Sequence, residues 1–311
     1  MDHLCILSKE NLALARFEAV SLLKPTQHEL KDNFLFLTEP SGIFRHLAYT
    51  RLFYRVLFSC NHEVLLPKIK NFDWNNYCKN TFSISVSGLD NKEEIIDAIN
   101  ESITSASVDL QNPETSFLVK FIDGRVYVLL KLWENIEKFA NRRSHLRPRS
   151  HPTSLDPKLA RACINLAGKT SGTIIDPFCG SGGILIEAGL LGFFPVGYDI
   201  SAEMLESCRV NLLHYNVTEF ELKNIDARQI SKKASAIVTD IPYGQNSGLN
   251  DDLVLLVRQF LNNSVNLTDT IVLMYPQFLG IKPLLGAWKI EKEFERYVHK
   301  SLTKRIALLR L

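Results

Sequence analysis

The stretch TIIDPFCGSGGILIEAGLLG, residues 173–192, holds a cluster of glycines between two apolar segments. Asp176 ends the first segment, and the glycines of the turn are Gly180, Gly182 and Gly183. Glycines here let the backbone approach a ligand closely at the carboxyl edge of an open α/β sheet. Leu185 stands where the nicotinamide fingerprint G-x-G-x-x-G needs its third glycine, and no P-loop lysine follows. The residues therefore predict a ligand-binding turn that is neither a nicotinamide-binding fingerprint nor a P-loop.

Asp199 ends a second apolar segment, within PVGYDIS, nineteen residues after Gly180. A carboxylate at this place can accept hydrogen bonds from both hydroxyls of a ribose. Taken alone, such a residue is as often a plain carboxylate at a helix N-terminus. Because it follows the glycine turn, Asp199 becomes a candidate for binding a cofactor.

A third apolar segment, within AIVTDIPYGQNS (236–247), ends in Asp240 and continues as Ile241, Pro242 and Tyr243. A carboxylate, a backbone carbonyl and an aromatic ring thus follow one another. Such a set can accept the hydrogens of an amino group and stack on a planar ring. Pro242 biases Ile241 toward an extended backbone. The hypothesis is that position 241 contributes only its carbonyl, which isoleucine offers as well as proline does, and that its amide makes no needed bond.

These candidates can act together only if one sheet brings the three strand ends to the same edge. Strands are expected at 173–177, 195–199, 220–224, 235–240 and 270–275, and helices at 154–168, 183–192, 201–215 and 251–263. Strand–helix alternation of this length means a parallel sheet covered on both faces. Near the C-terminus, KIEKEFERYV and KRIALLRL are expected to close it as an antiparallel edge. The second half is therefore predicted to be an α/β domain with a mostly parallel sheet.

The first half has the pattern of small α+β units. Strands are expected at 4–8, 33–39, 81–89 and, around an Asp-Gly turn, within 115–133, with helices at 10–23 and 92–104. Residues 141–157 hold three prolines among basic residues and are interpreted as a linker. Two such patterns in 311 residues predict two domains.

The composition excludes several classes of protein. It is 46% hydrophobic and 23% charged, which is ordinary for a globular chain. Six cysteines without a C-x-x-C pair argue against a zinc site and a disulfide framework, and they fit a reducing cytoplasm. The N-terminus lacks a signal-peptide pattern, and no apolar segment is long enough to span a bilayer. We expect a cytoplasmic protein without a membrane or metal partner.

Basic residues gather in two runs. Residues 138–161 hold seven Lys or Arg against one Asp, and residues 289–311 hold seven against three Glu. A single basic run is more often a solvated face. Two of them on a chain with a net charge of only +2 favour a polyanion as partner.

Taken together, the motifs resemble those of the class I S-adenosylmethionine-dependent methyltransferases. Motif I of that class is matched by D176-P-F-C-G-S-G-G183, its ribose-binding acid by Asp199 and its catalytic tetrapeptide by D240-I-P-Y243. The resemblance implies a Rossmann-like domain and S-adenosyl-L-methionine as the cofactor, with Asp226 holding the adenine amino group. The cofactor contacts that it implies are Asp176, Pro177, Phe178, Cys179, Gly180, Gly182, Gly183, Asp199, Ile200, Asp226, Ala227 and Asp240.

The likeness narrows to the archaeal enzymes that methylate the exocyclic N2 of guanosine at tRNA position 10. The segments that carry it are RPRSHPTSLDPKLARACINLAG (147–168), DPFCGSGGILIEAGLLG (176–192) and YVHKSLTKRIALL (297–309). The segment SVDLQNPETSFLVKFIDGRVYVLL (107–130) resembles the end of a THUMP RNA-binding domain. The domains implied are a ferredoxin-like segment (1–55), a THUMP domain (56–140), a basic linker (141–153) and a methyltransferase domain (154–311).

In this family the tetrapeptide would be the catalytic site. Its residues here are Asp240, Ile241, Pro242 and Tyr243. Asp240 and the carbonyl of Ile241 would accept the two N–H groups of the amine, and Tyr243 would stack on a base that has left its helix. The sequence departs from the family at Ile241, where a proline is usual, and at Gln245, where a basic residue is usual. The second departure weakens the inference of the nucleotide position.

tRNA is the partner that the family implies. The residues expected to contact its phosphates, without reading sequence, are Arg142, Arg143, Arg147, Arg149, Lys300 and Lys304. The sequence leaves open a small activating subunit and the choice between one and two methyl transfers.

Three alternatives remain at this stage. An adenine amino-methyltransferase on RNA or DNA would use the same tetrapeptide. An RNA-binding protein that keeps the fold without catalysis is supported only by Ile241. A nicotinamide dehydrogenase is disfavoured by the missing third glycine.

Overall fold

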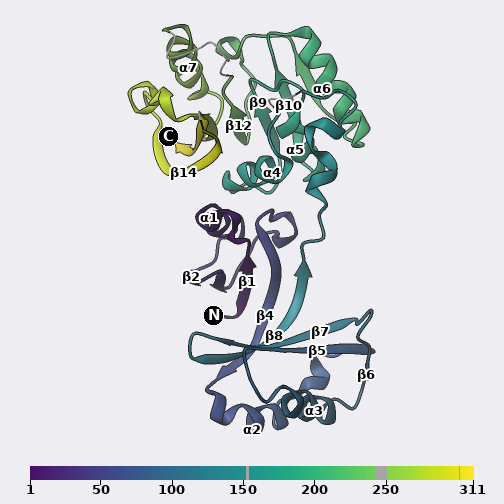
Figure 1. The fold of residues 1–311 in the computed structure, drawn as a ribbon. Helices are drawn as coiled ribbons and strands as arrows, with labels where there is room; N and C mark the ends of the chain where they lie inside the picture. The colour runs from purple at the N-terminus through teal and green to yellow at the C-terminus, as the bar shows by residue number, and fades with distance from the viewer. Residues whose placement is uncertain (152–153, 243–250, 301) are drawn as a thin grey trace. The chain divides into compact units, whose positions relative to one another are not determined.

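A computed structural model describes residues 1–151, 154–242, 251–300 and 302–311. Its contacts divide the chain into two compact units, each with its own sheet (Figure 1). The first unit comprises residues 1–12, 23–45 and 50–135. The second comprises residues 13–22, 46–49 and 136–311, so it is assembled from three separate pieces of the sequence.

The first unit is built on an eight-stranded sheet with the order β2-β3-β1-β4-β8-β7-β5-β6. Its strands are β1 (His3–Leu7), β2 (Gln27–Lys31), β3 (Phe34–Thr38), β4 (Thr50–Cys60), β5 (Thr81–Ser87), β6 (Ser107–Val108), β7 (Thr115–Ile122) and β8 (Arg125–Glu134). Helices α2 (Leu65–Lys70) and α3 (Lys92–Ser102) pack their apolar residues into one core with β5, β7 and β8. The predicted strands and the helix at 92–104 are confirmed.

The turn between β7 and β8 shows why the sequence pattern was informative there. Asp123 and Gly124 have φ angles of +47° and +78°. Two consecutive residues with positive φ form the turn whose twist matches that of the flanking strands, and Asp-Gly is a favoured pair for it. The predicted Asp-Gly hairpin is therefore confirmed.

The second unit contains a seven-stranded sheet with the order β11-β10-β9-β12-β13-β15-β14. Its strands are β9 (Thr173–Asp176), β10 (Phe194–Tyr198), β11 (Glu221–Lys223), β12 (Ala236–Asp240), β13 (Thr270–Pro276), β14 (Lys289–His299) and β15 (Leu302–Arg310). Strands β9 to β13 run parallel, and β15 inserts antiparallel between β13 and β14. The predicted mostly parallel sheet with an antiparallel edge is confirmed.

Five helices accompany this sheet in the described part of the unit. They are α1 (Leu12–Leu23), α4 (Pro157–Leu166), α5 (Gly183–Leu190), α6 (Ala202–His214) and α7 (Asp251–Ser264). The start of α4 follows from its sequence, because Asp156 accepts hydrogen bonds from the N–H groups of Lys158 and Leu159 and Pro157 takes the first helical position.

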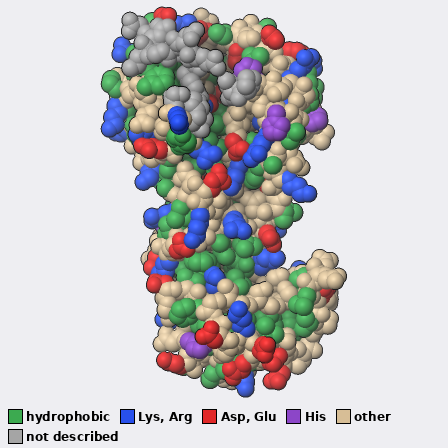
Figure 2. Space-filling model, in the orientation of Figure 1, with side chains coloured by type: hydrophobic (Ala, Val, Ile, Leu, Met, Phe, Trp, Pro, Cys, Tyr) green, Lys and Arg blue, Asp and Glu red, His purple; other side chains and the backbone are tan. Residues whose placement is uncertain are grey.

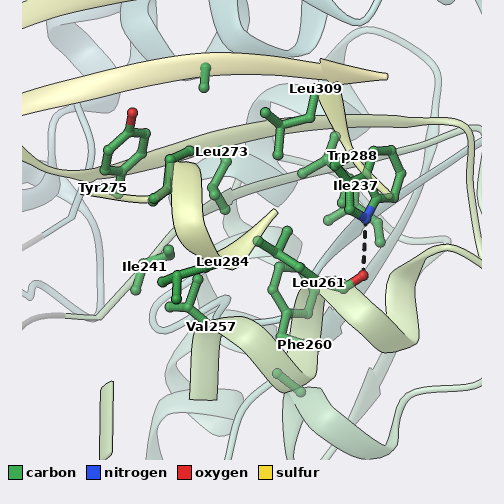
Figure 3. Packing of buried hydrophobic residues seen from close by; sticks show 14 of the residues in the cluster. Ile237, Ile241, Val257, Phe260, Leu261, Leu273, Tyr275, Leu284, Trp288 and Leu309 are labelled. Atoms are coloured by element: carbon green, nitrogen blue, oxygen red, sulfur yellow. Dashed lines mark hydrogen bonds between the residues drawn. The ribbon is translucent and has the colours of Figure 1, made fainter. Parts of the chain in front are cut away.

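Alternate residues of the central strands enter different cores. Ile237, Ile241 and Leu273 belong to a buried cluster that also includes residues of α7, such as Val257 and Phe260 (Figure 3). On the opposite face Met274 of β13 meets Cys163 of α4, with the two sulfur atoms 3.6 Å apart. Neighbouring residues at the end of β12 therefore point to opposite faces, with Ile241 in the α7 core.

Helix α1 joins the second unit through a buried acid. Glu18 accepts hydrogen bonds from the backbone N–H groups of Ala48 (2.7 Å) and Tyr49 (2.9 Å). It also accepts one from Nδ2 of Asn165 on α4, at 2.7 Å. The predicted boundaries near residues 55 and 140 stay a prediction, but residues 139–146 are not a free linker. They form two short 3-10 helices, η5 (Phe139–Arg142) and η6 (Ser144–Leu146), within the second unit.

No helix in the described residues is both long enough and apolar enough to cross a membrane. Across those same ranges, no group of three His, Cys, Asp or Glu side chains is arranged to hold a metal ion. On the face shown in Figure 2, Lys and Arg side chains lie interspersed with Asp and Glu.

Candidate active site

A cavity of about 830 Å³ lies at the carboxyl ends of the parallel strands of the second unit. It collects the predicted residues that follow β9, β10, β11 and β12. The predicted site residues that line it are Asp176, Pro177, Phe178, Cys179, Gly180, Gly183, Asp199, Ile200, Asp226, Ala227, Asp240, Ile241, Pro242 and Lys304. Of the predicted catalytic and cofactor residues, Gly182 does not line it, and Tyr243 lies outside the described residues.

The glycines of the turn after β9 have different roles. Gly180 has a φ of +49°, and a Cβ atom built on it would meet nothing within 4 Å. A Cβ on Gly182 would instead lie 2.6 Å from Sγ of Cys208, and its φ is +88°. Gly180 thus leaves room on the cavity side, whereas Gly182 is required for packing against α6. Gly182 does not line the cavity, and the ligand contact expected of it stays a prediction.

Asp199 ties two loops of the cavity together. One carboxylate oxygen accepts the backbone N–H of Gly180 at 2.9 Å, and the other accepts that of Ser201 at 2.8 Å. A carboxylate has about four acceptor positions, so both oxygens can still accept hydrogen bonds from a ligand. The next residue, Ile200, has 77% of its surface exposed although it is apolar. An acceptor pair beside an exposed apolar side chain suits a ribose and a heteroaromatic ring.

Asp226 is already engaged by a residue that sequence reasoning missed. It caps η7 (Ala227–Gln229) by accepting the N–H of Arg228, and the guanidinium of Arg228 forms two further hydrogen bonds to the carboxylate, at 2.6 and 2.9 Å. These bonds from Arg228 hold the pKa of Asp226 below its usual value. Arg228 also lines the cavity. The D-x-R spacing after β11 is the signal that could have indicated the pair.

Asp176 is a buried carboxyl at the end of β9. Its Oδ1 accepts hydrogen bonds from the hydroxyl of Thr239 (2.6 Å) and the N–H of Phe178 (3.2 Å). Burial raises its pKa to about 7, against the opposing effect of these two bonds. Asp176 therefore fixes the turn to β12, and its protonation changes near neutral pH.

Asp240 forms a buried ion pair with Lys304. The ammonium of Lys304 donates to Oδ2 of Asp240. The side chain of Lys304 is 8% exposed and that of Asp240 is 17% exposed. Oδ1 of Asp240 is buried and has no hydrogen-bond partner among the described residues. Burial raises the pKa of Asp240, while the adjacent Lys304 acts to lower it. The described residues therefore leave this acceptor oxygen without a donor.

Ile241 does more than supply a carbonyl. Its side chain is 1% exposed and belongs to the cluster in Figure 3, with Val257 and Leu284. Its N–H donates to the carbonyl of Met274 at 2.9 Å, which extends the pairing of β12 with β13. The expectation that position 241 contributes only its carbonyl is wrong, because both the side chain and the amide are used.

Three of the predicted phosphate contacts are not on the surface. Arg142 donates to both carboxylate oxygens of Glu187, at 2.6 and 3.2 Å, and Glu187 is also paired with Arg161 at 2.9 Å. Arg147 is buried and donates to Oγ of Ser154 at 2.6 Å and to the carbonyl of Arg142 at 2.9 Å. Together with Lys304, these residues make their bonds inside the protein, and little of their side chains is accessible to a phosphate. That they bind RNA stays a prediction.

The other three predicted RNA contacts keep accessible side chains. Arg143, Arg149 and Lys300 are exposed. The side chain of Arg143 retains 58% of its exposed area and lies 3.8 Å from Asp156, a separation that leaves the guanidinium largely in water. Their role in binding RNA stays a prediction.

The strand order, the glycine turn and the acids at the ends of β10 and β12 define a class I S-adenosylmethionine-dependent methyltransferase. The model of the RMKL-like methyltransferase domain matches residues 144–306, and a DNA methylase model matches residues 69–209. The chain is 36% identical over 281 residues to the tRNA (guanine(10)-N2)-dimethyltransferase of Methanothermobacter thermautotrophicus, covering 85% of this chain and 83% of that one.

A second relative is an enzyme of the same name from another organism. The tRNA (guanine(10)-N2)-dimethyltransferase of Pyrococcus abyssi is 32% identical over 320 residues and is matched over 94% of both chains. The chain belongs to the family of the tRNA (guanine(10)-N2)-dimethyltransferases. Among solved structures, TrmN from Thermus thermophilus has the same fold, with a TM-score of 0.50, 17% identity, and coverage of 99% of this chain and 98% of that one.

The residues of the cavity fit the cofactor that this class uses. Gly180 leaves room on the ligand side, and Asp199 presents two carboxylate oxygens there. Ile200 and Phe178 offer apolar surface, and the volume lies within the range of ligand pockets. Asp199 would hold the ribose of S-adenosylmethionine, and Ile200 would cover its adenine.

Proposed function

We propose that this protein transfers methyl groups from S-adenosylmethionine to the exocyclic N2 of guanosine 10 in tRNA, the reaction that gives its relatives their name. One observation carries the proposal. Asp240, whose Oδ1 has no hydrogen-bond partner among the described residues, lines the cavity that also holds Asp199 and Gly180. A carboxylate with one oxygen left for an amine N–H thus belongs to the same cavity as the residues expected to hold the cofactor.

S-adenosylmethionine, when bound, supplies a methyl carbon on a sulfonium, whose C–S bond breaks with the electron pair left on sulfur. The guanine N2 is a weak nucleophile, since its lone pair is delocalised into the ring. Oδ1 of Asp240 would accept one N–H of this amine, and the carbonyl of Ile241 would accept the other. As N2 gains the methyl group it must lose a proton, and in this proposal Asp240 takes it.

The target base must leave its stack to reach this cavity. We propose that Tyr243, which follows Pro242 but lies outside the described residues, stacks on it. A stacking contact of this kind stabilises binding by about 1–3 kcal/mol per base.

We further propose that the first unit binds the tRNA, with a ferredoxin-like segment at 1–55 and a THUMP domain at 56–140. Support comes from its α+β architecture. Helix α3 connects β5 to β6, and both β6 and β7 pair in parallel with β5. The exposed Arg143, Arg149 and Lys300 would contact phosphates near the catalytic domain. An activating subunit stays an open proposal.

The decisive experiment is single-turnover methylation of an unmodified tRNA transcript with labelled S-adenosylmethionine, followed by mapping of the methylated nucleotide. The matched control is the same transcript with adenosine at position 10. We expect label on N2 of guanosine 10 in the first transcript and none at that position in the second. Label elsewhere, or equal labelling of both transcripts, would refute the proposed position.

A second candidate, methylation of an adenine amino group, is favoured by the DNA methylase model. That match ends at residue 209 and so does not include Asp240. Nucleoside mass spectrometry of the labelled RNA separates N2-methylguanosine from N6-methyladenosine. Cofactor binding without any turnover would instead favour a catalytically silent RNA-binding protein.

A further inference from the structure

The position of Lys304 follows from the antiparallel insertion of β15. Because β15 runs against β13, its first residues lie at the edge where the parallel strands end. Asp240 pairs with Met274, and Met274 pairs with Ile306. Lys304 precedes Ile306 by two residues, so its side chain is on the same face of the sheet as that of Asp240. The register therefore directs the ammonium across β13 toward the carboxylate.

The two oxygens of Asp240 have different environments as a result. Oδ2 accepts a hydrogen bond from Lys304, whereas Oδ1 has no partner among the described residues. A buried carboxyl without a cation tends to keep its proton, because burial penalises the charged form. A protonated carboxyl would present a donor where the amine needs an acceptor.

We propose that Lys304 is a positioning residue for methyl transfer, which fixes Oδ2 of Asp240 and keeps the carboxylate charged, so that Oδ1 accepts an N–H of the substrate amine and then its proton. The proposal rests on the proposed function, because it assigns Lys304 a role only if Asp240 binds an amine. It also explains a lysine that is nearly inaccessible to a polyanion.

The other titratable groups around Asp240 do not supply the charge of Lys304. Asp176 on β9 interacts electrostatically with Asp240, and so does the buried thiol of Cys163 on α4. Asp252 on α7 lines the same cavity. All three are acids, so their ionised forms would disfavour a charged Asp240. The basic side chains of Arg228 and His151 also line the cavity, but Lys304 is the one that forms an ion pair with Asp240 and stabilises its charge.

The test measures the single-turnover methylation rate against pH, at saturating labelled cofactor, with the full chain and an unmodified tRNA transcript. Lys304→Met removes the charge and keeps the length, and Lys304→Arg keeps the charge. Lys292→Met is the matched control, because Lys292 is an exposed lysine on the neighbouring β14. Calorimetry with the cofactor and a melting curve show that each variant is folded.

We expect Lys304→Met to be slower by at least about tenfold at neutral pH, and its rate to keep rising at pH values where the wild-type rate has levelled off. Removing the cation raises the pKa of Asp240 further, so the carboxylate forms only at higher pH. Lys304→Arg and Lys292→Met should keep the wild-type pH profile. A folded Lys304→Met with the wild-type profile, whether its rate is normal or uniformly lower, overturns the proposal.

If Lys304→Met does not fold, the pH profile of Lys304→Arg tests the proposal instead. The proposal is overturned if the folded arginine variant reaches its full rate at a different pH from wild type. It is supported if the rise of the rate with pH is the same in both. Asp240→Asn is measured in parallel to separate the two hypotheses. If wild type methylates no guanosine N2, or if Asp240→Asn keeps the full rate, the proposed function fails. If both of those results are as expected and only the Lys304 profile is not, the positioning role alone fails.

Discussion

Glu18 and Asn165 are 147 residues apart in the sequence, yet the amide nitrogen of Asn165 lies 2.7 Å from Oε1 of Glu18 in the interior of the second unit. The same carboxylate accepts two backbone N–H groups, from Ala48 and Tyr49. One side chain thus connects α1, residues 46–49 and α4. The methyltransferase unit therefore includes a helix from the N-terminal part of the chain.

Replacing Glu18 by alanine should strongly destabilise the protein. The substitution removes the carboxylate that accepts two buried backbone N–H groups and one of the two hydrogen bonds of the Asn165 amide, and we expect a loss of about 2–5 kcal/mol in the free energy of unfolding. Denaturant unfolding measures this loss. Glu219→Ala, at an exposed glutamate, is the control and should stay within about 0.5 kcal/mol of wild type. Equal stabilities of the two variants would contradict the role of Glu18.

A fragment of residues 150–311 should fail to bind the cofactor. It lacks Glu18, the partner of Asn165, and Arg142, which pairs with the buried Glu187. Breaking a buried ion pair by removing one partner costs about 3–5 kcal/mol, which is a large part of the stability of a domain. Calorimetry measures the affinity of the fragment and of the full chain for S-adenosylmethionine, and circular dichroism shows whether the fragment is folded. A folded fragment with full-chain affinity would show that α1 and Arg142 are dispensable.

Asp199→Ala should weaken cofactor binding by about 1.5–3 kcal/mol, the contribution of hydrogen bonds to a charged group. The variant also loses the bonds to Gly180 and Ser201, so the turn should become less ordered. Isothermal calorimetry gives the affinity, and Asp97→Ala, at an exposed acid of the first unit, is the control. Unchanged affinity of Asp199→Ala would remove this residue from the site.

Ile241→Pro should destabilise the protein by about 2–4 kcal/mol, although proline is the usual residue of the family's tetrapeptide. The substitution removes the N–H that donates to Met274 and vacates part of the α7 core. Ile241→Val keeps the amide and should cost only about 0.5–1.5 kcal/mol. Thermal and denaturant unfolding compare the two. A proline variant as stable as wild type would restore the view that position 241 supplies only its carbonyl.

The stability of the cofactor-free protein should depend on pH through Asp176. Its pKa is raised to about 7 in the folded state, from 3.8 for an ordinary Asp. The folded state then binds more protons than the unfolded state between these values, so the contribution of Asp176 to stability is fully present below pH 3.8 and is lost as the pH rises through about 7.

Asp176→Asn tests this assignment. An asparagine oxygen can still accept the bonds from Thr239 and Phe178, which both go to Oδ1. We therefore expect the variant to be more stable than wild type above pH 7, by more than about 1 kcal/mol, and the difference to shrink toward acid pH. Unfolding curves of both proteins at several pH values give the comparison. A difference that does not vary with pH would mean that Asp176 ionises at its ordinary value.

The sequence predicted the sheet because strand–helix alternation is a local pattern. It also predicted the residues at the strand ends, since Asp176, Asp199 and Asp240 each end an apolar segment. What it could not predict depends on register and on distant partners. Lys304 reaches Asp240 only because β15 inserts beside β13, and a basic run does not reveal that Arg142 has a buried acid, Glu187, as its partner.

The discontinuous second unit has a consequence for the order of events during synthesis. Helix α1 leaves the ribosome early, whereas its partner Asn165 is made 147 residues after Glu18. At about 5–20 residues per second, Glu18 is without that partner for roughly 7–30 s. Because β2 to β8 of the first unit are translated within this interval, the nascent chain completes that unit's sequence before α1 can contact α4. Translation speed between residues 18 and 165 thus sets how long an apolar helix with an uncompensated acid is exposed to chaperones.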